Sequence, residues 1–206
     1  MPEGELGVWK CEESIEFFFR QMPLFEVEIE ELKKLSSRKK IEWLSSRYLL
    51  HQMSGRDVRG ACFKDEYGKP YLAGSRYLIS MSHSRDLTAV IAGPRAVGVD
   101  IQYPVEKIGR IAHRFMNDAE LNAVNIGDVE MLHIVWGAKE CVFKAYGRKS
   151  LDFRQHININ VPNQNRLDLI KEINFEGVMN KNGHAIRFKF ASKKINNAIL
   201  VYAVEQ

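Results

Sequence analysis

Two acidic residues lie in segments rich in apolar residues, where the presence of a carboxylate has to be explained. Asp100 lies in the apolar run of residues 97–101, and Glu140 lies forty residues later in a segment with helical spacing of apolar residues. A carboxylate buried without partners is costly, so such an acid is either a hydrogen-bonded structural group or an oxygen ligand for a hard cation such as Mg²⁺. The residues alone leave both interpretations of Asp100 open.

Lys144 follows Glu140 by four positions, so a helix would place both side chains on one face. The same spacing is typical of an ordinary surface ion pair, which contributes only about 0.3–0.5 kcal/mol. The pair is therefore informative only in combination with other residues.

A hydroxyl and an imidazole follow the β-rich run of residues 77–81, in the sequence Ser82-His83-Ser84, where we expect a turn. Adjacent side chains do not normally point at each other, and the sequence contains no G-x-S-x-G, so we do not expect a serine hydrolase triad. His83 is then either an exposed turn residue or a donor to a phosphate group.

Residues 29–53 carry apolar residues at helical spacing, and the serines at 36 and 37 predict a break and a cap between two amphipathic helices. The polar faces of these helices hold six cations: Lys33, Lys34, Arg38, Lys39, Lys40 and Arg47. Such a run is either a solvated face or a surface that meets phosphate. The turn signal Gly68-Lys69-Pro70 would add Lys69 as a fixed positive charge.

Composition and motif content exclude several classes of protein. The 206 residues, 45% hydrophobic and 27% charged, are enough for one domain or two small ones and exclude disordered and fibrous chains. Neither a Walker A loop, a G-x-G-x-x-G, an H-E-x-x-H nor an EF-hand loop occurs in the sequence. The net charge of +4 suits an anionic ligand or an acidic protein partner.

The cysteines and apolar runs indicate the compartment. The three cysteines Cys11, Cys62 and Cys141 form no C-x-x-C, so neither a disulfide framework nor a cysteine zinc site is expected. The N-terminus lacks a basic region, and no apolar run is long enough to cross a membrane. We therefore expect a cytoplasmic protein without membrane contact.

The remaining periodicity predicts mixed helices and strands. Strands are expected at 77–81, 87–92, 97–101, 157–161, 186–190 and 198–204, and helices from about 118 and over 129–146. Asn182-Gly183 is typical of a type I′ hairpin turn. Because helices precede strands in both parts of the chain, we predict an α+β fold, with a duplicated unit as one arrangement.

Five segments, taken in order, resemble the motif series of the 4′-phosphopantetheinyl transferases, in particular the larger, surfactin-type group. They are Gly68-Lys69-Pro70, Ser82-His83-Ser84, Gly98-Val99-Asp100-Ile101, Arg114-Phe115 and Trp136-x-x-Lys139-Glu140-x-x-x-Lys144-Ala145. Arg47 also resembles the arginine that ends the first basic helical region of the family. These motifs cover about residues 33–147.

The resemblance implies a pseudo-dimer of two similar α+β halves, which we assign to residues 1–98 and 99–206. It implies transfer of the phosphopantetheine arm of coenzyme A to a serine of an acyl or peptidyl carrier protein, with release of adenosine 3′,5′-bisphosphate. It also implies Mg²⁺ as cofactor and a monomeric enzyme. The basic surplus is compatible with an acidic carrier protein.

The resemblance gives each residue a role. The implied metal ligands are Asp100 and Glu140. Glu140 is also the candidate base, directly or through a metal-bound water, and Lys144 is the group that stabilises or protonates the leaving phosphate. The implied contacts to coenzyme A are Lys69, Ser82 and His83 at phosphate oxygens, and Arg47, helped by Lys34, Arg38 or Lys64, at the 3′-phosphate.

One position departs from the pattern. Many relatives carry a second acid where this chain has Gln102, and a neutral amide cannot act as a base. Gln102 therefore keeps open an alternative, a degenerate non-catalytic relative that binds nucleotide or carrier protein. A nucleic-acid binder using the basic helices is a further alternative, but without a recognisable binding fold we expect no nucleic-acid partner.

Overall fold

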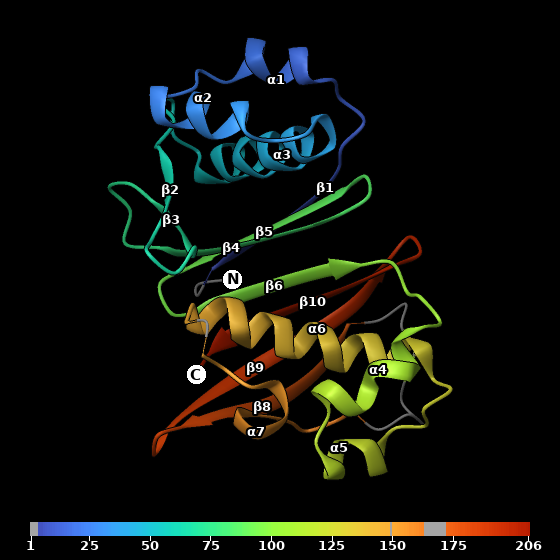
Figure 1. The fold of residues 1–206 in the computed structure, drawn as a ribbon. Coiled ribbons are helices and arrows are strands. Elements are labelled where there is room, and N and C mark those ends of the chain that lie inside the picture. The colour runs from blue at the N-terminus through green and yellow to red at the C-terminus, as the bar shows by residue number, and fades with distance from the viewer. Residues whose placement is uncertain (1–3, 149, 163–171) are drawn as a thin grey trace.

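A computed structural model describes residues 4–148, 150–162 and 172–206. Within these residues the strands form two five-stranded antiparallel sheets, in the orders β1-β5-β4-β3-β2 and β6-β10-β9-β8-β7 (Figure 1). Each sheet carries its own helices, so the predicted α+β class is confirmed and the two sheets indicate two halves. The division between residues 98 and 99 stays a prediction.

The first sheet is built from the N-terminal strands. Its members are β1 (Glu5–Lys10), β2 (Cys62–Lys64), β3 (Pro70–Leu72), β4 (Leu78–Ser84) and β5 (Leu87–Gly93). Helices α1 (Ile15–Gln21), α2 (Glu26–Lys33) and α3 (Ser37–Ser54) lie on the side of this sheet that faces away from the second sheet (Figure 1). The break predicted at residues 36 and 37 is confirmed, since Ser36 occupies the N-cap of α3.

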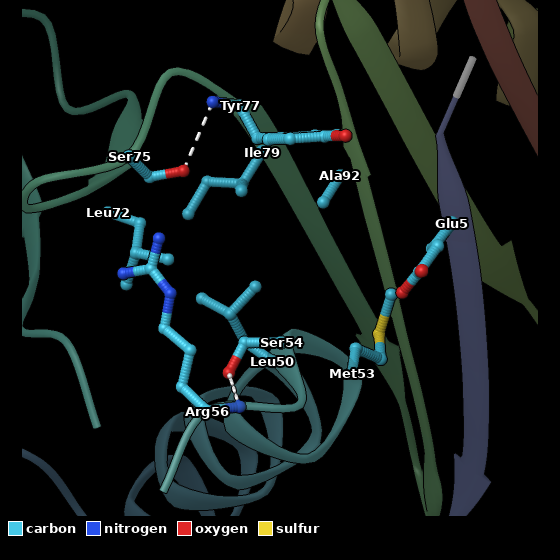
Figure 2. Close-up of a pocket in the computed structure, with 10 residues that line it drawn as sticks. All are labelled: Glu5, Leu50, Met53, Ser54, Arg56, Leu72, Ser75, Tyr77, Ile79 and Ala92. Atoms are coloured by element: carbon cyan, nitrogen blue, oxygen red, sulfur yellow. Dashed lines mark hydrogen bonds between the residues drawn. The ribbon is translucent and has the colours of Figure 1, made fainter. Parts of the chain in front are cut away.

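Helix α3 packs on the first sheet through Leu50, which belongs to a buried cluster with Ile79 and Val90. At the C-terminal end of α3 the helix and the sheet enclose a pocket of about 200 Å³ with an apolar floor. Arg56 and Glu5 lie on opposite sides of this pocket (Figure 2).

The second sheet is built mostly from C-terminal strands. Its members are β6 (Val97–Gln102), β7 (Ile157–Ile159), β8 (Ile173–Lys181), β9 (His184–Ile195) and β10 (Ala198–Glu205). The helices of this half are α4 (Ile108–Phe115), α5 (Asp118–Ala123), α6 (Val129–Tyr146) and α7 (Phe153–His156). Asn182 and Gly183 connect β8 to β9 with φ of 52° and 79°, which confirms the predicted hairpin.

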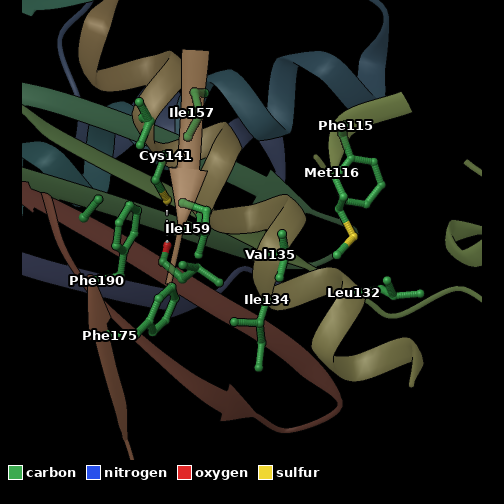
Figure 3. Packing of buried hydrophobic residues seen from close by; sticks show 14 of the residues in the cluster. Phe115, Met116, Leu132, Ile134, Val135, Cys141, Ile157, Ile159, Phe175 and Phe190 are labelled. Atoms are coloured by element: carbon green, nitrogen blue, oxygen red, sulfur yellow. Dashed lines mark hydrogen bonds between the residues drawn. The ribbon is translucent and has the colours of Figure 1, made fainter. Parts of the chain in front are cut away.

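Helix α6 fills the core of the second half. Its buried residues Ile134 and Val135 pack in one cluster with Phe175 and Phe190, whose stacked rings lie 5.0 Å apart (Figure 3). The bounds predicted for this helix are confirmed, because Gly147 ends it in the left-handed conformation at φ 71°.

Ser82-His83-Ser84 was expected in a turn, and this is wrong: the residues belong to β4, because Ser84 still pairs with Leu87 of β5. The hairpin turn is Arg85-Asp86, and Arg85 takes φ 55° although arginine is not a usual turn residue. Helix α5 begins at Asp118, as predicted, and Asn117 and Glu120 form a capping box there through reciprocal hydrogen bonds.

Candidate functional site

Strand β4 of the first sheet lies against β6 of the second (Figure 1). Two serines of β4 join these strands. The Ser80 hydroxyl accepts a hydrogen bond from the backbone N–H of Val99, and the Ser82 hydroxyl accepts one from Ile101, each at 3.2 Å. Because successive side chains of a strand point to opposite faces, the odd-numbered residues of β4 lie on the side of α3. Strand β4 thus contributes to both halves of the molecule.

Helix α6 approaches β6 closely at Gly98. A Cβ atom at Gly98 would lie 2.0 Å from the carbonyl oxygen of Cys141, so only glycine permits this contact. The Cys141 thiol donates to the carbonyl of Val201 at 3.3 Å and so ties the helix to β10 as well (Figure 3). The close approach brings the face of α6 that carries Glu140 and Lys144 to the end of β6 that carries Asp100.

Asp100 and Lys144 form an ion pair between β6 and α6. The Lys144 Nζ donates to Asp100 Oδ1 at 2.8 Å, to the carbonyl of Val99 at 2.9 Å and to the Ser82 hydroxyl at 3.2 Å. Burial alone would lower the pKa of Lys144, but the adjacent Asp100 carboxylate raises it above its ordinary value. The Ser82 hydroxyl in turn donates to Asp100 Oδ1 at 3.0 Å, so Asp100 is held from two sides.

Glu140 completes the cluster as a carboxylate with little compensation. Burial raises its pKa, and the negative charge of Asp100 adds to this effect while Lys144 opposes it. No hydrogen bond or ion pair from the parts of the chain that the structure describes reaches the Glu140 carboxylate.

Carboxylate oxygens are the ligands that Mg²⁺ prefers, and Asp100 and Glu140 lie near enough to each other to interact electrostatically, so the residues present fit that ion. Asp100 and Glu140 would then be its protein ligands. The described residues contain no group of three or more histidine, cysteine or acidic side chains arranged to hold a metal. Gln102, two residues after Asp100 on β6, donates through its amide to the carbonyl of His133 at 3.3 Å.

A cleft of about 200 Å³ lies beside this cluster, between the turn before β3, strand β4 and the end of α6. Lys144 lines it together with Lys69, whose Nζ donates to the carbonyl of Ala145 at 2.5 Å. Burial lowers the pKa of Lys69. Arg148 also lines the cleft, with its guanidinium carbon 4.1 Å from the centre of the Tyr67 ring.

A second pocket of about 260 Å³ continues the cleft, since Pro70 and Met81 line both. Its basic lining residues are Arg47, Lys64, His83 and Lys39, and one acid, Glu42, lines it as well. The basic residues come from α3, β2 and β4, which the fold brings together. We call this pocket the anion pocket.

A comparison with protein-family models decides the family. The model described as the 4′-phosphopantetheinyl transferase superfamily matches residues 96–202, which is more than half of the chain. The chain belongs to this superfamily. A search of curated proteins finds no match. Among the described residues, no helix is long and apolar enough to cross a membrane.

In this superfamily member, the residues predicted to contact coenzyme A separate into two groups. Arg47, Lys64 and His83 line the anion pocket, and Lys69 lines the adjoining cleft. Ser82, Lys34 and Arg38 line neither of the two. Lys34 lies at the C-cap of α2, and the exposed Arg38 pairs with Glu42 at 3.2 Å.

Arg47 is the most enclosed cation of the anion pocket. Its side chain is 4% exposed, its guanidinium carbon lies 3.5 Å from the centre of the Trp43 ring, and one terminal nitrogen lies 3.7 Å from Glu31. Burial lowers its pKa. Glu31 also binds Lys64 at 2.5 Å and so holds two of the predicted cations near each other.

Sequence reasoning gave no separate role to several residues of the candidate site. Glu31 and Glu42 orient the cations, and Lys39, predicted only as one of the six cations of the basic helices, lines the anion pocket. The sequence signal for the roles of Glu31 and Glu42 is that both are acids within a basic segment. The role of Ser80 in joining the halves had no signal, because it depends on which strand of the other sheet lies opposite.

Proposed function

We propose that the chain is a surfactin-type 4′-phosphopantetheinyl transferase that moves the phosphopantetheine arm of coenzyme A to a serine of an acyl or peptidyl carrier protein. The observation that carries this proposal is the cluster of Asp100, Glu140 and Lys144 beside a cleft that leads into the anion pocket. Both halves of one chain contribute to this site, which supports a monomeric enzyme.

The proposed reaction is a single displacement at phosphorus. The carrier serine oxygen forms a bond to the β-phosphorus of coenzyme A, and the bond from that phosphorus to the bridging oxygen breaks. The bridging oxygen leaves with adenosine 3′,5′-bisphosphate, and the serine proton passes to a base. This step needs charge neutralisation and correct positioning more than covalent chemistry by the protein.

Glu140 is the proposed base. Its carboxylate has no hydrogen-bond partner among the described residues, and burial raises its pKa, which makes it a better proton acceptor than an exposed glutamate. Lys144 keeps its proton because Asp100 raises its pKa, so its positive charge is available to the leaving phosphate.

Asp100 and Glu140 are also the proposed ligands of Mg²⁺. When bound, the ion would neutralise the diphosphate and orient the phosphorus for attack. In this proposal Ser82 has a supporting role, because its hydroxyl is engaged with Asp100, Ile101 and Lys144. The phosphate contact expected of Ser82 would require it to exchange one of these bonds.

The anion pocket is the proposed site of the nucleotide part of coenzyme A. Arg47 and Lys64 would bind the 3′-phosphate, since both positive groups line one pocket. His83, which is half-exposed with Nδ1 3.5 Å from Glu42, and Lys69 would contact the diphosphate. Tyr67 and Met81, in the adjoining cleft, would border the path of the pantetheine arm.

A non-catalytic relative is the second candidate, and Gln102 is the observation that favours it. The Gln102 amide is bound to the carbonyl of His133 on α6, so it serves the packing of this helix on β6. A catalytic protein would therefore have only the carboxylates of Asp100 and Glu140 to bind the metal and to act as the base.

The test is incubation with coenzyme A, Mg²⁺ and a panel of apo carrier proteins, with mass spectrometry of the carrier serine. We expect the phosphopantetheine mass on at least one carrier, and no product from Asp100→Ala or Glu140→Ala in folded protein. The matched control is Glu130→Ala, an acid on the exposed start of the same helix, which should keep full activity. Binding of coenzyme A without transfer to any carrier would favour the non-catalytic alternative.

A further inference from the structure

Helix α3 contains two buried nitrogen atoms without a hydrogen-bond partner in the described chain. They are Nε of Arg47 and Nδ1 of His51. The two residues are four positions apart, so they lie one above the other on the same face of the helix. Buried polar atoms are nearly always hydrogen-bonded, so two such atoms side by side need an explanation.

Both residues line the same small pocket, which opens toward the exposed residues Ser54 and Arg56. Its volume is about 10 Å³, and Leu50, Cys62 and Arg59 contribute to its wall. This is about the volume that a single water molecule needs. This small pocket lies along α3 next to the anion pocket, and Arg47 lines both.

The two nitrogens have complementary hydrogen-bonding chemistry, and a bridging molecule can link them. Arginine Nε can only donate, whereas histidine Nδ1 accepts when the ring proton is on Nε2. A water molecule can accept from one and donate to the other, and a halide ion could not donate to His51. The neighbouring cation Arg59 does not call for an anion, because its terminal nitrogens bind both carboxylate oxygens of Glu28.

We propose that one bound water links Arg47 Nε to His51 Nδ1 and that His51 is thereby a positioning residue for coenzyme A binding. This inference rests on the proposed function of the anion pocket. One terminal nitrogen of Arg47 already donates to the carbonyl of Trp43 at 3.3 Å. A further bond at Nε fixes the plane of the guanidinium, so that its remaining donors meet a phosphate in one orientation.

The test compares His51→Leu with His51→Asn. The leucine removes the acceptor, whereas Oδ1 of an asparagine takes nearly the position of Nδ1 and restores it. Titration calorimetry with coenzyme A and with 3′-dephospho-coenzyme A measures the preference for the 3′-phosphate. We expect His51→Leu to lose about tenfold of this preference, the scale of one hydrogen bond to a charged group, and His51→Asn to keep it.

Further outcomes separate positioning from folding. In His51→Leu the affinity for 3′-dephospho-coenzyme A and kcat should stay as in the wild type, while KM for coenzyme A rises. Equal loss of affinity for both ligands, or an unchanged preference, would overturn the proposal. If the wild type binds neither ligand, the proposed function fails, but NMR of the Arg47 Nε–H still tests the water link. Slow exchange of this proton with solvent in the wild type and in His51→Asn, together with fast exchange in His51→Leu, would support the link.

Discussion

At the scale of single residues, the surroundings of Glu140 shift its pKa from the ordinary value of a glutamate. Burial raises its pKa, the positive charge of Lys144 offsets part of this effect, and the nearby Asp100 carboxylate adds to it. A raised pKa means that the folded protein favours the protonated form, so ionised Glu140 costs stability wherever the unfolded chain is already deprotonated. This cost begins as the pH rises through the ordinary range of a glutamate and is complete above the raised pKa of the folded state.

We therefore expect Glu140→Gln to melt about 2–4 °C higher than the wild type at pH 7.5 without metal, the shift that ~1 kcal/mol produces in a chain of this size. Near pH 4 the difference should vanish, because Glu140 is then largely protonated in the folded state. Added Mg²⁺ should stabilise the wild type and not the variant. Thermal denaturation followed by circular dichroism measures all three, and a lower melting temperature of the variant at pH 7.5 without metal would contradict the argument.

Sequence reasoning at this scale identified types of residue but not their partners. Asp100 and Lys144 were assigned from motifs, whereas their ion pair at 2.8 Å follows from the contact of α6 with β6. Ser82 was assigned to phosphate, yet its hydrogen bonds lie within the cluster. No pattern in the sequence indicates which hydroxyl is engaged by the protein itself.

At the scale of elements, α6 positions the site because β6 lets it come close. Gly98→Ala would place a methyl group 2.0 Å from the carbonyl oxygen of Cys141, and backbone cannot move aside as a side chain can. We expect a loss of about 3 kcal/mol in the free energy of unfolding and lower transfer activity in the protein that still folds. Gly127→Ala, whose methyl would lie 3.4 Å from the nearest atom, should change stability little in urea denaturation. Equal effects of the two substitutions on the free energy of unfolding would contradict the close contact of α6 with β6 as the cause.

The opposite face of α6 is anchored by a buried ion pair. Lys139 is 0% exposed, and its Nζ lies 2.7 Å from Glu120 and donates to the carbonyl groups of Phe153 and Ile157. Lys139→Met should cost about 3–5 kcal/mol, because it leaves a carboxylate buried without its partner. Lys194→Met, which breaks the exposed pair with Glu130, should cost less than about 1 kcal/mol in the same denaturation experiment.

Many of the elements were predictable, but β1, α1, β2 and β3 were not predicted. The bounds of α6 followed from its apolar stripe and from Gly147, since both signals are local. Helix α4 was not predicted, and its N-cap Lys107 makes no side-chain cap, so the usual start signal is missing. Strand β4 was predicted too short because its turn residue Arg85 carries no turn signal.

At the scale of the whole molecule, the site forms where the two sheets meet. Ser80→Ala and Ser82→Ala each remove an acceptor for a backbone N–H of β6, so both should lower stability by about 1–2 kcal/mol. Only Ser82→Ala should also reduce transfer to the carrier, because only Ser82 holds Asp100. Melting curves and initial rates measure the two effects. Equal loss of activity in both variants would show that the junction of the sheets, rather than Asp100, sets the rate.

The convergence of cations in the anion pocket was beyond the reach of sequence reasoning. Arg47, Lys64 and His83 come from three elements of one half, and their meeting depends on how α3 packs on the sheet. The basic run in α2 and α3 was visible, but Lys34 and Arg38 have the same composition signal and lie outside the pocket. Local periodicity describes a face of a helix and not what the rest of the chain brings to it.

Both faces of β4 carry residues with a role, and this limits the insertions and deletions that the strand can accept. Even-numbered serines reach β6, while odd-numbered Met81 and His83 line the anion pocket. Insertion or deletion of one residue within β4 would exchange these two sets, placing hydroxyls among the cations and apolar side chains at the junction. Only changes of two residues preserve both faces, so homologues of this chain should differ within this strand by even numbers or not at all.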